Sequence, residues 1–309
     1  MIKTVTLNPA MDKTVEINGF TVGTVNRIAA VRLDAGGKGI NVAKVLKVLE
    51  GQSQALGILA GHNGQVIKAY LDEQGIDNDF VFVAGETRTN LKVVDFLNHT
   101  HTDINEPGAE INPQDLQELQ QKIFAEITPK SILILSGSVP VKMQRHIYQA
   151  WILQARASGA RTILDADGEL LQEGVKAAPS VIKPNIHELE RLLNRQISSP
   201  GDAVVASRSL LELGIGLVVV SMGEDGALFV QKDQAIQADG LKVEVKSTVG
   251  AGDAMVAALA LALDRQYSLE ETVALSVATS AAQVMTPGTE PPRLSDVRVL
   301  TEKVRFRYV

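Results

Sequence analysis

Short apolar runs recur along the C-terminal two thirds of the chain, and segments of helical periodicity separate them. The runs are rich in Ile, Leu and Val, and they cover residues 131–135, 161–164, 180–183 and 216–220. Runs of this length without polar alternation are typical of parallel strands that are buried on both faces. The intervening segments predict helices at 113–127, 143–157, 169–175, 187–193 and 203–213. This alternation predicts an α/β protein with a mostly parallel sheet that is covered by helices on both faces.

The N-terminal third alternates in the same way, but additional strand-like segments interrupt it. Strands are expected at 2–7, 54–60 and 78–83, and helices at 42–49 and 63–74. The additional β-branched segments lie at 14–17, 25–31 and 88–97, and the polar segment 98–108 predicts a hairpin turn plus a loop. We expect the segments at about 12–33 and 88–105 to form a small sheet, a lid on a single domain that spans residues 1–309.

Beyond Gly226 the chain predicts an antiparallel edge to the main sheet, followed by helices. The expected strands cover 227–231, 235–238 and 241–246, and the expected helices cover 254–263, 269–285 and 295–304. No internal repeat or linker divides the chain.

Polar residues or glycines follow most of the predicted parallel strands. Ligands of such sheets bind beyond the carboxyl ends of the strands, so these residues should meet in one place. They are Ser138, Asp165, Lys183, Asn185, Ser221 and Gly223.

Residues 247–254 join a strand-like segment to a helix that contains no breaker. Gly250, Ala251 and Gly252 therefore lie at a helix N-terminus, where unpaired N–H groups and the helix dipole favour an anion. Asp253 has two interpretations, a carboxylate that caps the helix or a general base beside an anion site. The dipole is expected to lower the pKa of Asp253. Taken alone, this stretch favours the cap.

The composition restricts the class of protein. The 309 residues carry a formal net charge of -6, which argues against a nucleic-acid-binding protein and requires any basic anion site to be local. There is no cysteine, so disulfides, thiolate catalysis and cysteine metal sites are excluded. The N-terminus lacks the layout of a signal peptide, and the longest apolar run is about half as long as a membrane-spanning helix. We expect a cytoplasmic protein without nucleic-acid or membrane partners.

Two glycine-rich segments at predicted helix starts invite comparison with nucleotide-binding loops. Gly250–Met255 lacks the third glycine of the dinucleotide fingerprint and the βαβ unit that should follow it. Gly36-Gly-Lys-Gly39 lacks the spacing of a Walker A loop. Neither segment therefore supports one of these two loops.

The motifs and their order instead resemble those of the ribokinase-type, or PfkB, sugar kinase family. Four segments carry the resemblance: Gly36-Gly-Lys-Gly-Ile-Asn41, Lys183-Pro-Asn185-Ile-His-Glu188, Ser221-Met-Gly-Glu-Asp-Gly226 and Thr248-Val-Gly-Ala-Gly-Asp253. Thr6–Asp12 and Thr87–Lys92 are similar to the branch of the family that phosphorylates sugar phosphates. The resemblance implies a ribokinase-like three-layer α/β/α sandwich with a small β-sheet lid. It also implies ATP- and Mg²⁺-dependent phosphorylation of a ketohexose phosphate, with fructose 1-phosphate favoured over tagatose 6-phosphate.

By this resemblance each motif has a role in phosphoryl transfer. Asp253 is the general base, and the N–H groups of Gly250, Ala251 and Gly252 form the anion hole. The sugar phosphate is expected to bind Asp12, Arg27, Gly37, Lys38, Asn41, Arg88 and Ser138. The nucleotide is expected to bind Lys183, Asn185, Gly252, Asp253 and the loop of Ser221, Met222, Gly223, Glu224, Asp225 and Gly226. Glu188 and Asn185 would organise Mg²⁺.

Alternatives stay open for several of these residues. Glu188 is equally an ordinary acid in the first turn of a helix, Asn185 an N-cap, and Lys183 a solvated charge at a strand end. Ala254, where serine is more frequent, and Asp165-Ala-Asp-Gly168, in place of a hydroxyl-rich segment, depart from the family pattern. A catalytically silent sugar-phosphate sensor is a second hypothesis, which the intact Gly250–Asp253 disfavours. The exposed edges of a small lid sheet predict a homodimer formed through the lid.

Overall fold

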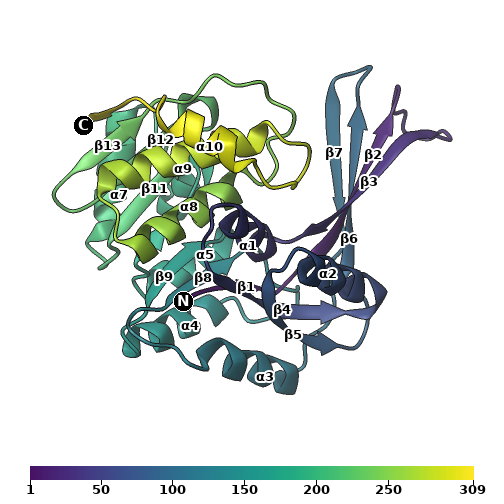
Figure 1. Cartoon of the computed structure of the whole chain (residues 1–309), viewed down its shortest axis with the longest axis horizontal. Helices are drawn as coiled ribbons and strands as arrows, with labels where there is room; N and C mark the ends of the chain where they lie inside the picture. The colour runs from purple at the N-terminus through teal and green to yellow at the C-terminus, as the bar shows by residue number, and fades with distance from the viewer.

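The computed structural model describes residues 1–309 and contains two sheets, one inside a layered body and one that projects from it (Figure 1). The strands are β1 (Ile2–Thr6), β2 (Ala10–Ile17), β3 (Ile28–Gly36), β4 (Ser53–Ala60), β5 (Asp77–Val83), β6 (Arg88–Asp95), β7 (Thr100–Asn105), β8 (Ile132–Ser136), β9 (Arg161–Asp165), β10 (Val181–Ile182), β11 (Leu217–Ser221), β12 (Ala227–Val230), β13 (Ala235–Ala238) and β14 (Phe306–Tyr308). The helices are α1 (Lys38–Val48), α2 (Gly61–Glu73), α3 (Pro113–Phe124), α4 (Ile147–Ala157), α5 (Gly168–Val175), α6 (Ile186–Leu193), α7 (Pro200–Leu211), α8 (Ala251–Arg265), α9 (Leu269–Val284) and α10 (Leu294–Thr301), with a short 3-10 turn η1 (Gly223–Asp225).

The main sheet has the strand order β14-β13-β12-β11-β10-β9-β8-β1-β4-β5. The strands from β11 to β5 run parallel, whereas β12, β13 and β14 are antiparallel to their neighbours. The chain order reverses at β1, because β4 and β5 lie on one side of it and β8 to β11 on the other. Ligands of open α/β sheets bind at such a switch point, beyond the carboxyl ends of the strands.

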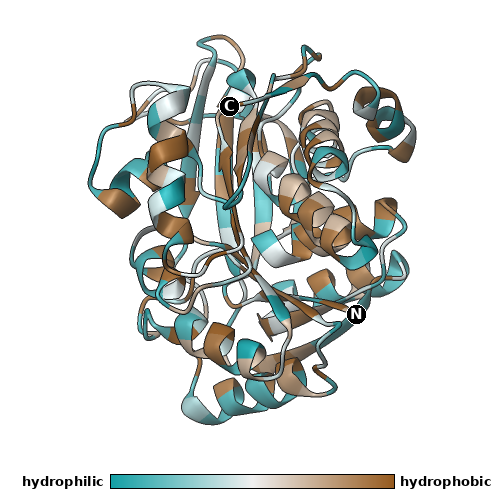
Figure 2. Cartoon of the chain, turned by 90° about the vertical axis from the view of Figure 1, so that its left-hand side faces the viewer, coloured by the Kyte–Doolittle hydropathy of each residue, from teal (hydrophilic) through white to brown (hydrophobic).

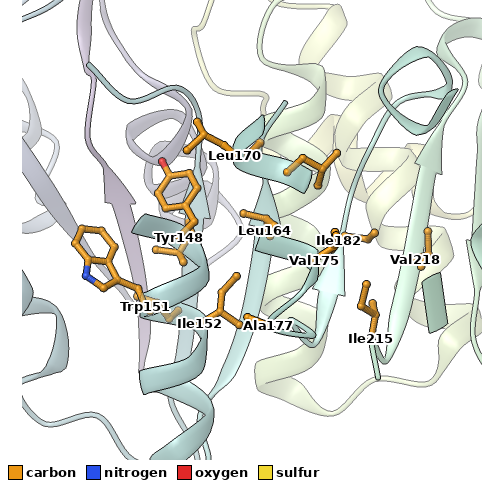
Figure 3. Packing of buried hydrophobic residues seen from close by; sticks show 14 of the residues in the cluster. Tyr148, Trp151, Ile152, Leu164, Leu170, Val175, Ala177, Ile182, Ile215 and Val218 are labelled. Atoms are coloured by element: carbon orange, nitrogen blue, oxygen red, sulfur yellow. The ribbon is translucent and has the colours of Figure 1, made fainter. Parts of the chain in front are cut away.

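Helices cover both faces of the main sheet, as the apolar runs predict. Helices α3 to α7 pack on one face, where Tyr148 and Trp151 of α4 lie against the buried side chains of the sheet (Figure 3). Helices α1, α2, α8, α9 and α10 pack on the other face. Figure 2 shows the hydrophobic strands in the middle, between the two helix layers. None of the helices combines the length and the apolar content needed to cross a bilayer.

The lid is a separate four-stranded sheet with the order β3-β2-β6-β7, seen at the upper right of Figure 1. It leaves the body directly after β1 and again after β5, and it returns through α1 and α3. The strand register aligns polar residues in a row across one face, namely Asp34, Asp12, Asn90 and Asn105. The opposite face carries a small apolar cluster of its own around Val15, Ile17 and Val93. The predicted lid is therefore present, with one polar and one apolar face.

The expected strand at 241–246 is wrong, since these residues form no strand. Strand β13 pairs instead with β14 at the end of the chain, where no strand was expected. Because β14 occupies the free edge of β13, the apolar side chains of Leu241 and Val243 pack against the core without joining the sheet.

Two boundaries in the lid also differ from the prediction. Strand β3 covers Ile28–Gly36 in place of 25–31, and β7 is a strand where a turn and a loop were expected. Every residue of β7 is exposed, so it lacks the apolar alternation by which a half-buried strand is recognised.

Candidate active site

A cleft of about 630 Å³ lies between the carboxyl edge of the main sheet and the polar face of the lid. Most of the predicted site residues line it, although they come from segments along the whole chain. They are Asp12, Gly37, Lys38, Asn41, Arg88, Ser138, Lys183, Asn185, Glu188, Ser221, Gly250, Gly252 and Asp253.

Asp253 lies in the first turn of α8, beside the helix N-terminus that opens on the cleft. The helix begins after Gly250, whose φ of 80° requires the left-handed backbone that glycine adopts easily. No side chain caps this helix. The carboxylate of Asp253 instead accepts a hydrogen bond from Asn41 Nδ2 at 2.8 Å. The interpretation of Asp253 as a cap is therefore wrong.

Burial raises the pKa of Asp253, contrary to the expectation from the helix dipole. The residue is only 7% exposed, and burial disfavours the ionised carboxylate. The charge of Asp165 adds to the rise, whereas Lys38, the hydrogen bond from Asn41, and Lys183 oppose it. Burial thus outweighs the charges that favour ionisation. A carboxylate with a raised pKa is a stronger proton acceptor once it is ionised.

Two lysines that line the cleft, Lys38 and Lys183, flank the buried Asp165. Asp165 is the last residue of β9, and its side chain is 1% exposed. Its two carboxylate oxygens lie 3.2 Å from Lys38 Nζ and 3.2 Å from Lys183 Nζ. Although burial favours the neutral amine, Asp165, Asp253 and Glu188 hold the pKa of Lys38 above its ordinary value. Lys183 is buried and paired, so the interpretation as a solvated charge is wrong.

Asn185 and Glu188 form a capping box at the start of α6. Asn185 Oδ1 accepts a hydrogen bond from the Glu188 N–H at 2.8 Å, and Glu188 Oε2 accepts one from the Asn185 N–H at 2.9 Å. The alternative that both residues cap a helix is therefore confirmed. Both also line the cleft, and the second carboxylate oxygen of Glu188 takes no part in the box. Such an oxygen fits Mg²⁺, which prefers oxygen ligands and keeps several waters.

The lid supplies the opposite wall of the cleft. Asp12 accepts a hydrogen bond from Asn90 Nδ2 at 2.9 Å, and burial raises the pKa of Asp12. Arg88 donates to the backbone carbonyls of Glu106 and Asn8, but its buried Nε has no partner. Lys92 follows Asn90 on the same face of β6 and opposes Asp103 of β7. This wall therefore offers both a carboxylate and cationic groups to a ligand.

Arg27 does not belong to this cleft. It lies in the exposed loop between β2 and β3, at the end of the lid that is far from the body. The structure therefore does not bring Arg27 together with the other residues predicted to bind the sugar phosphate. Conversely, Lys92, Asn90 and Asn8 line the cleft without having been predicted. Lys92 and Asn90 could have been found from the sequence, because they lie two residues apart on a predicted strand and so point to the same face of the sheet.

A second cavity of about 480 Å³ adjoins the cleft at Ser221 and Gly252. Its apolar wall comes from α9 and from residues 241–245, and its polar wall includes Gly223, Glu224 and Gly226. Ala251, which does not line the cleft, lines this cavity. A mostly apolar cavity with a few polar groups is typical of a site for a small molecule or cofactor.

Only part of the predicted nucleotide loop lines this second cavity. Met222 and Asp225 face a different cavity, between η1 and α7. Residues of this loop face two different cavities because η1 is a tight turn. The hydrogen bond from the Met222 N–H to the Gly226 carbonyl closes the loop around it.

Comparison with known proteins agrees with this geometry. The model of the pfkB family of carbohydrate kinases matches residues 5–296. The chain belongs to this family. The 1-phosphofructokinase of Xanthomonas campestris is 41% identical over 91% of this chain and 90% of its own, and that of Bacillus subtilis is 36% identical over 91% and 92%. The solved structure of phosphofructokinase-2 from Escherichia coli in complex with substrates and products has a TM-score of 0.93 at 32% identity, with 98% of both chains covered. The predicted family and the ribokinase-like fold are confirmed.

Proposed function

We propose that this kinase transfers the γ-phosphoryl group of ATP to fructose 1-phosphate and forms fructose 1,6-bisphosphate. The observation that carries the proposal is the buried carboxylate of Asp253 beside the uncapped N-terminus of α8. Phosphoryl transfer depends mainly on positioning and on stabilising charge, with a base to accept the proton. Relatives named 1-phosphofructokinase, at 41% and 36% identity, support the choice of substrate.

In this reaction the acceptor hydroxyl lies at Asp253 and the γ-phosphoryl group at the N–H groups of Gly250, Ala251 and Gly252. The hydroxyl oxygen forms a bond to the γ-phosphorus, and the bond from that phosphorus to the bridging oxygen of ADP breaks. The carboxylate of Asp253 takes the hydroxyl proton. The N–H groups stabilise the negative charge on the transferred group, as in an oxyanion hole.

The donor side of the cleft suits ATP with Mg²⁺. Lys183 lies beside the N-terminus of α8, where it neutralises phosphate charge, and Glu188 with Asn185 would hold the metal. When bound, the metal stabilises the charge that develops on the phosphates. The second cavity, with Gly223, Glu224 and Gly226 on its polar wall, would take the adenine ring.

The acceptor side of the cleft suits the sugar phosphate. Asp12 and Asn41 would bind its hydroxyls, with Gly37 and Ser138 beside them, and Lys38 lies next to this pocket. Arg88 and Lys92 would bind the phosphate of the sugar, since charge-assisted bonds to phosphate are strong. The unpaired Nε of Arg88 supports this role.

A substrate panel tests the proposal. The purified protein is assayed with ATP and Mg²⁺ against fructose 1-phosphate, tagatose 6-phosphate and fructose 6-phosphate. The highest kcat/KM is expected for fructose 1-phosphate. A higher kcat/KM for tagatose 6-phosphate would transfer the assignment to that sugar. Binding of fructose 1-phosphate without formation of ADP would identify a sensor.

We also propose that the apolar face of the lid binds a second copy of this chain. Leu33, Lys13, Leu91 and Ile104 oppose one another in a row across this face. Leu33 and Ile104 are 59% and 53% exposed, which is costly for large apolar side chains unless a partner covers them. Sedimentation velocity is expected to show a dimer at micromolar concentration, and a monomer there would refute the contact.

A further inference from the structure

We propose that Asp165 is a positioning residue, which fixes the ammonium groups of Lys38 and Lys183 on the two sides of the phosphoryl-transfer path. The proposal rests on the proposed function and assigns a role to a residue that does not itself contact either substrate. Asp165 ends β9 between β8 and β10, buried beneath the two lysines that line the cleft. Its backbone carbonyl accepts a hydrogen bond from the Gly137 N–H at 2.9 Å, so the residue is held at both its backbone and its side chain.

Each carboxylate oxygen of Asp165 serves one lysine. Oδ2 accepts a hydrogen bond from Lys38 Nζ at 3.2 Å, and Oδ1 lies 3.2 Å from Lys183 Nζ. Lys38 comes from the first turn of α1 and Lys183 follows β10, so the two lysines reach Asp165 from different elements. With a side chain only 1% exposed, Asp165 has no solvent to share its charge with, and the two ammonium groups are its counterions.

The two lysines flank the reacting groups. The Nζ of Lys183 lies 3.1 Å from the point where a Cβ would stand on Gly252, so this ammonium sits against the anion hole. The stem of Lys38 passes Gly137, at 3.5 Å from the corresponding point, and its side chain is 38% exposed toward the cleft. Lys183 is therefore on the side of the nucleotide phosphates, and Lys38 is on the side of Ser138 and the sugar.

A fixed position matters because a lysine is a point charge on a flexible stem. Charges that are already in place stabilise a transition state without reorganising during the reaction. The negative charge of Asp165 also limits how strongly the two lysines attract ATP before the reaction. Binding the ground state less tightly than the transition state is what increases kcat. Loss of the Asp165 charge should therefore lower kcat while ATP affinity is kept or increased.

The substitution Asp165→Asn removes the charge and keeps the shape. We expect kcat to fall at least tenfold, with little change in KM for fructose 1-phosphate. The Kd of ATP, measured by calorimetry without sugar, is expected to be equal to or below that of the wild type. Asp79→Asn is the control, because Asp79, on β5, also pairs with a lysine, Lys122 of α3, but does not line the cleft. Its kcat should stay within twofold of wild type.

A double-mutant cycle with Lys38→Met separates positioning from a purely structural role. If Asp165 acts through the lysines, Asp165→Asn should lower kcat much less in the Lys38→Met background than in the wild type. Equal factors in both backgrounds would overturn the proposal, as would a kcat within twofold of wild type. A tenfold weaker ATP affinity of a folded Asp165→Asn variant would also overturn it. The Kd of ATP is measured without sugar, so it does not depend on which sugar is the substrate. A wild-type protein that does not phosphorylate fructose 1-phosphate would therefore refute only the proposed substrate.

Discussion

The main sheet and the lid form opposite walls of one cleft, but they are built in different ways. Strands β1 and β8 of the main sheet are buried along their whole length, whereas every residue of β7 in the lid is exposed. The main sheet packs against two helix layers. The lid packs against the body only at its base, through Met11 and Ala35, and otherwise has the small apolar cluster around Val15, Ile17 and Val93. A region with few buried contacts opens at a lower free-energy cost than a core.

This difference corresponds to a division of chemical work. Asp253, Lys183 and Asp165 are held by the body, where small displacements are costly and the reacting atoms need fixed partners. Asp12, Arg88 and Lys92 are carried by the lid, where they meet a ligand that has to enter and leave. We therefore expect changes in the body to act on kcat and changes in the lid to act on KM.

The largest effect is expected for Asp253→Asn, which removes the proton acceptor from the body. Loss of a general base lowers kcat by about 10²–10⁴-fold. The Kd of ATP should stay close to that of the wild type, because the N–H groups of α8 and Lys183 are unchanged. Steady-state kinetics and calorimetry measure the two quantities. Asp264→Asn, at the other end of α8, is the control and should keep normal turnover. Turnover of Asp253→Asn close to wild type would refute the assigned base.

A smaller effect is expected for Lys92→Met, which removes a cation from the lid. A hydrogen bond to a charged group contributes about 1.5–3 kcal/mol, so KM for fructose 1-phosphate should rise about tenfold or more. The control is Lys68→Met, because Lys68 lies on α2, pairs with Asp72, and lines neither the cleft nor the apolar face of the lid. An unchanged KM in Lys92→Met, or an equal rise in both variants, would contradict a direct contact with the sugar phosphate.

Asp95→Asn tests whether the lid is stabilised independently of the body. The buried carboxylate of Asp95 accepts hydrogen bonds from the N–H groups of Gly19, Phe20, Leu97 and Asn98, and it ties the two hairpin ends of the lid together. Although burial opposes ionisation, these bonds hold the pKa of Asp95 well below its usual range. In Asp95→Asn, hydrogen exchange should accelerate in lid amides and remain slow in β1 and β8. Faster exchange in the main sheet would show that the two regions unfold together.

The smallest effect concerns stability and pH. The pKa of Asp253 is raised in the folded state, so protonation of this carboxyl favours folding. That stabilisation is fully present below the unfolded-state pKa and is lost as the pH rises through the folded-state pKa. At neutral pH the wild type is therefore destabilised by an ionised buried group that Asp253→Asn lacks. The variant should therefore have a higher melting temperature than the wild type at pH 7. The difference should shrink on acidification, and a lower melting temperature at pH 7 would contradict the raised pKa.

Prediction from the sequence was accurate for the parallel strands of the main sheet because burial on both faces leaves a clear pattern. The apolar runs at β8 and β11, and the glycine-rich entries to α1 and α8, mark elements that depend on local residues alone. The motifs at these entries also placed Asn41 and Asp253 in the cleft, and the motif before α6 placed Lys183 there.

The errors concern features that depend on distant segments. The strand expected at 241–246 is absent because β14, from the far end of the chain, occupies the edge of β13. The direction of the Asp253 pKa shift depends on burial by the folded chain, which the helix dipole does not reveal. Strand β7 is polar and exposed on both faces, so only its partner β6 reveals it.

The division of work between body and lid is tested most directly by the kcat of Lys92→Met at saturating fructose 1-phosphate. Once the sugar is bound, the groups that transfer the phosphoryl belong to the body and are unchanged in this variant. The kcat is therefore expected to stay within about threefold of wild type, a difference of less than 1 kcal/mol in the barrier. A kcat that falls 100-fold or more, as for Asp253→Asn, would show that the lid takes part in the chemical step. It would contradict the division of work between body and lid.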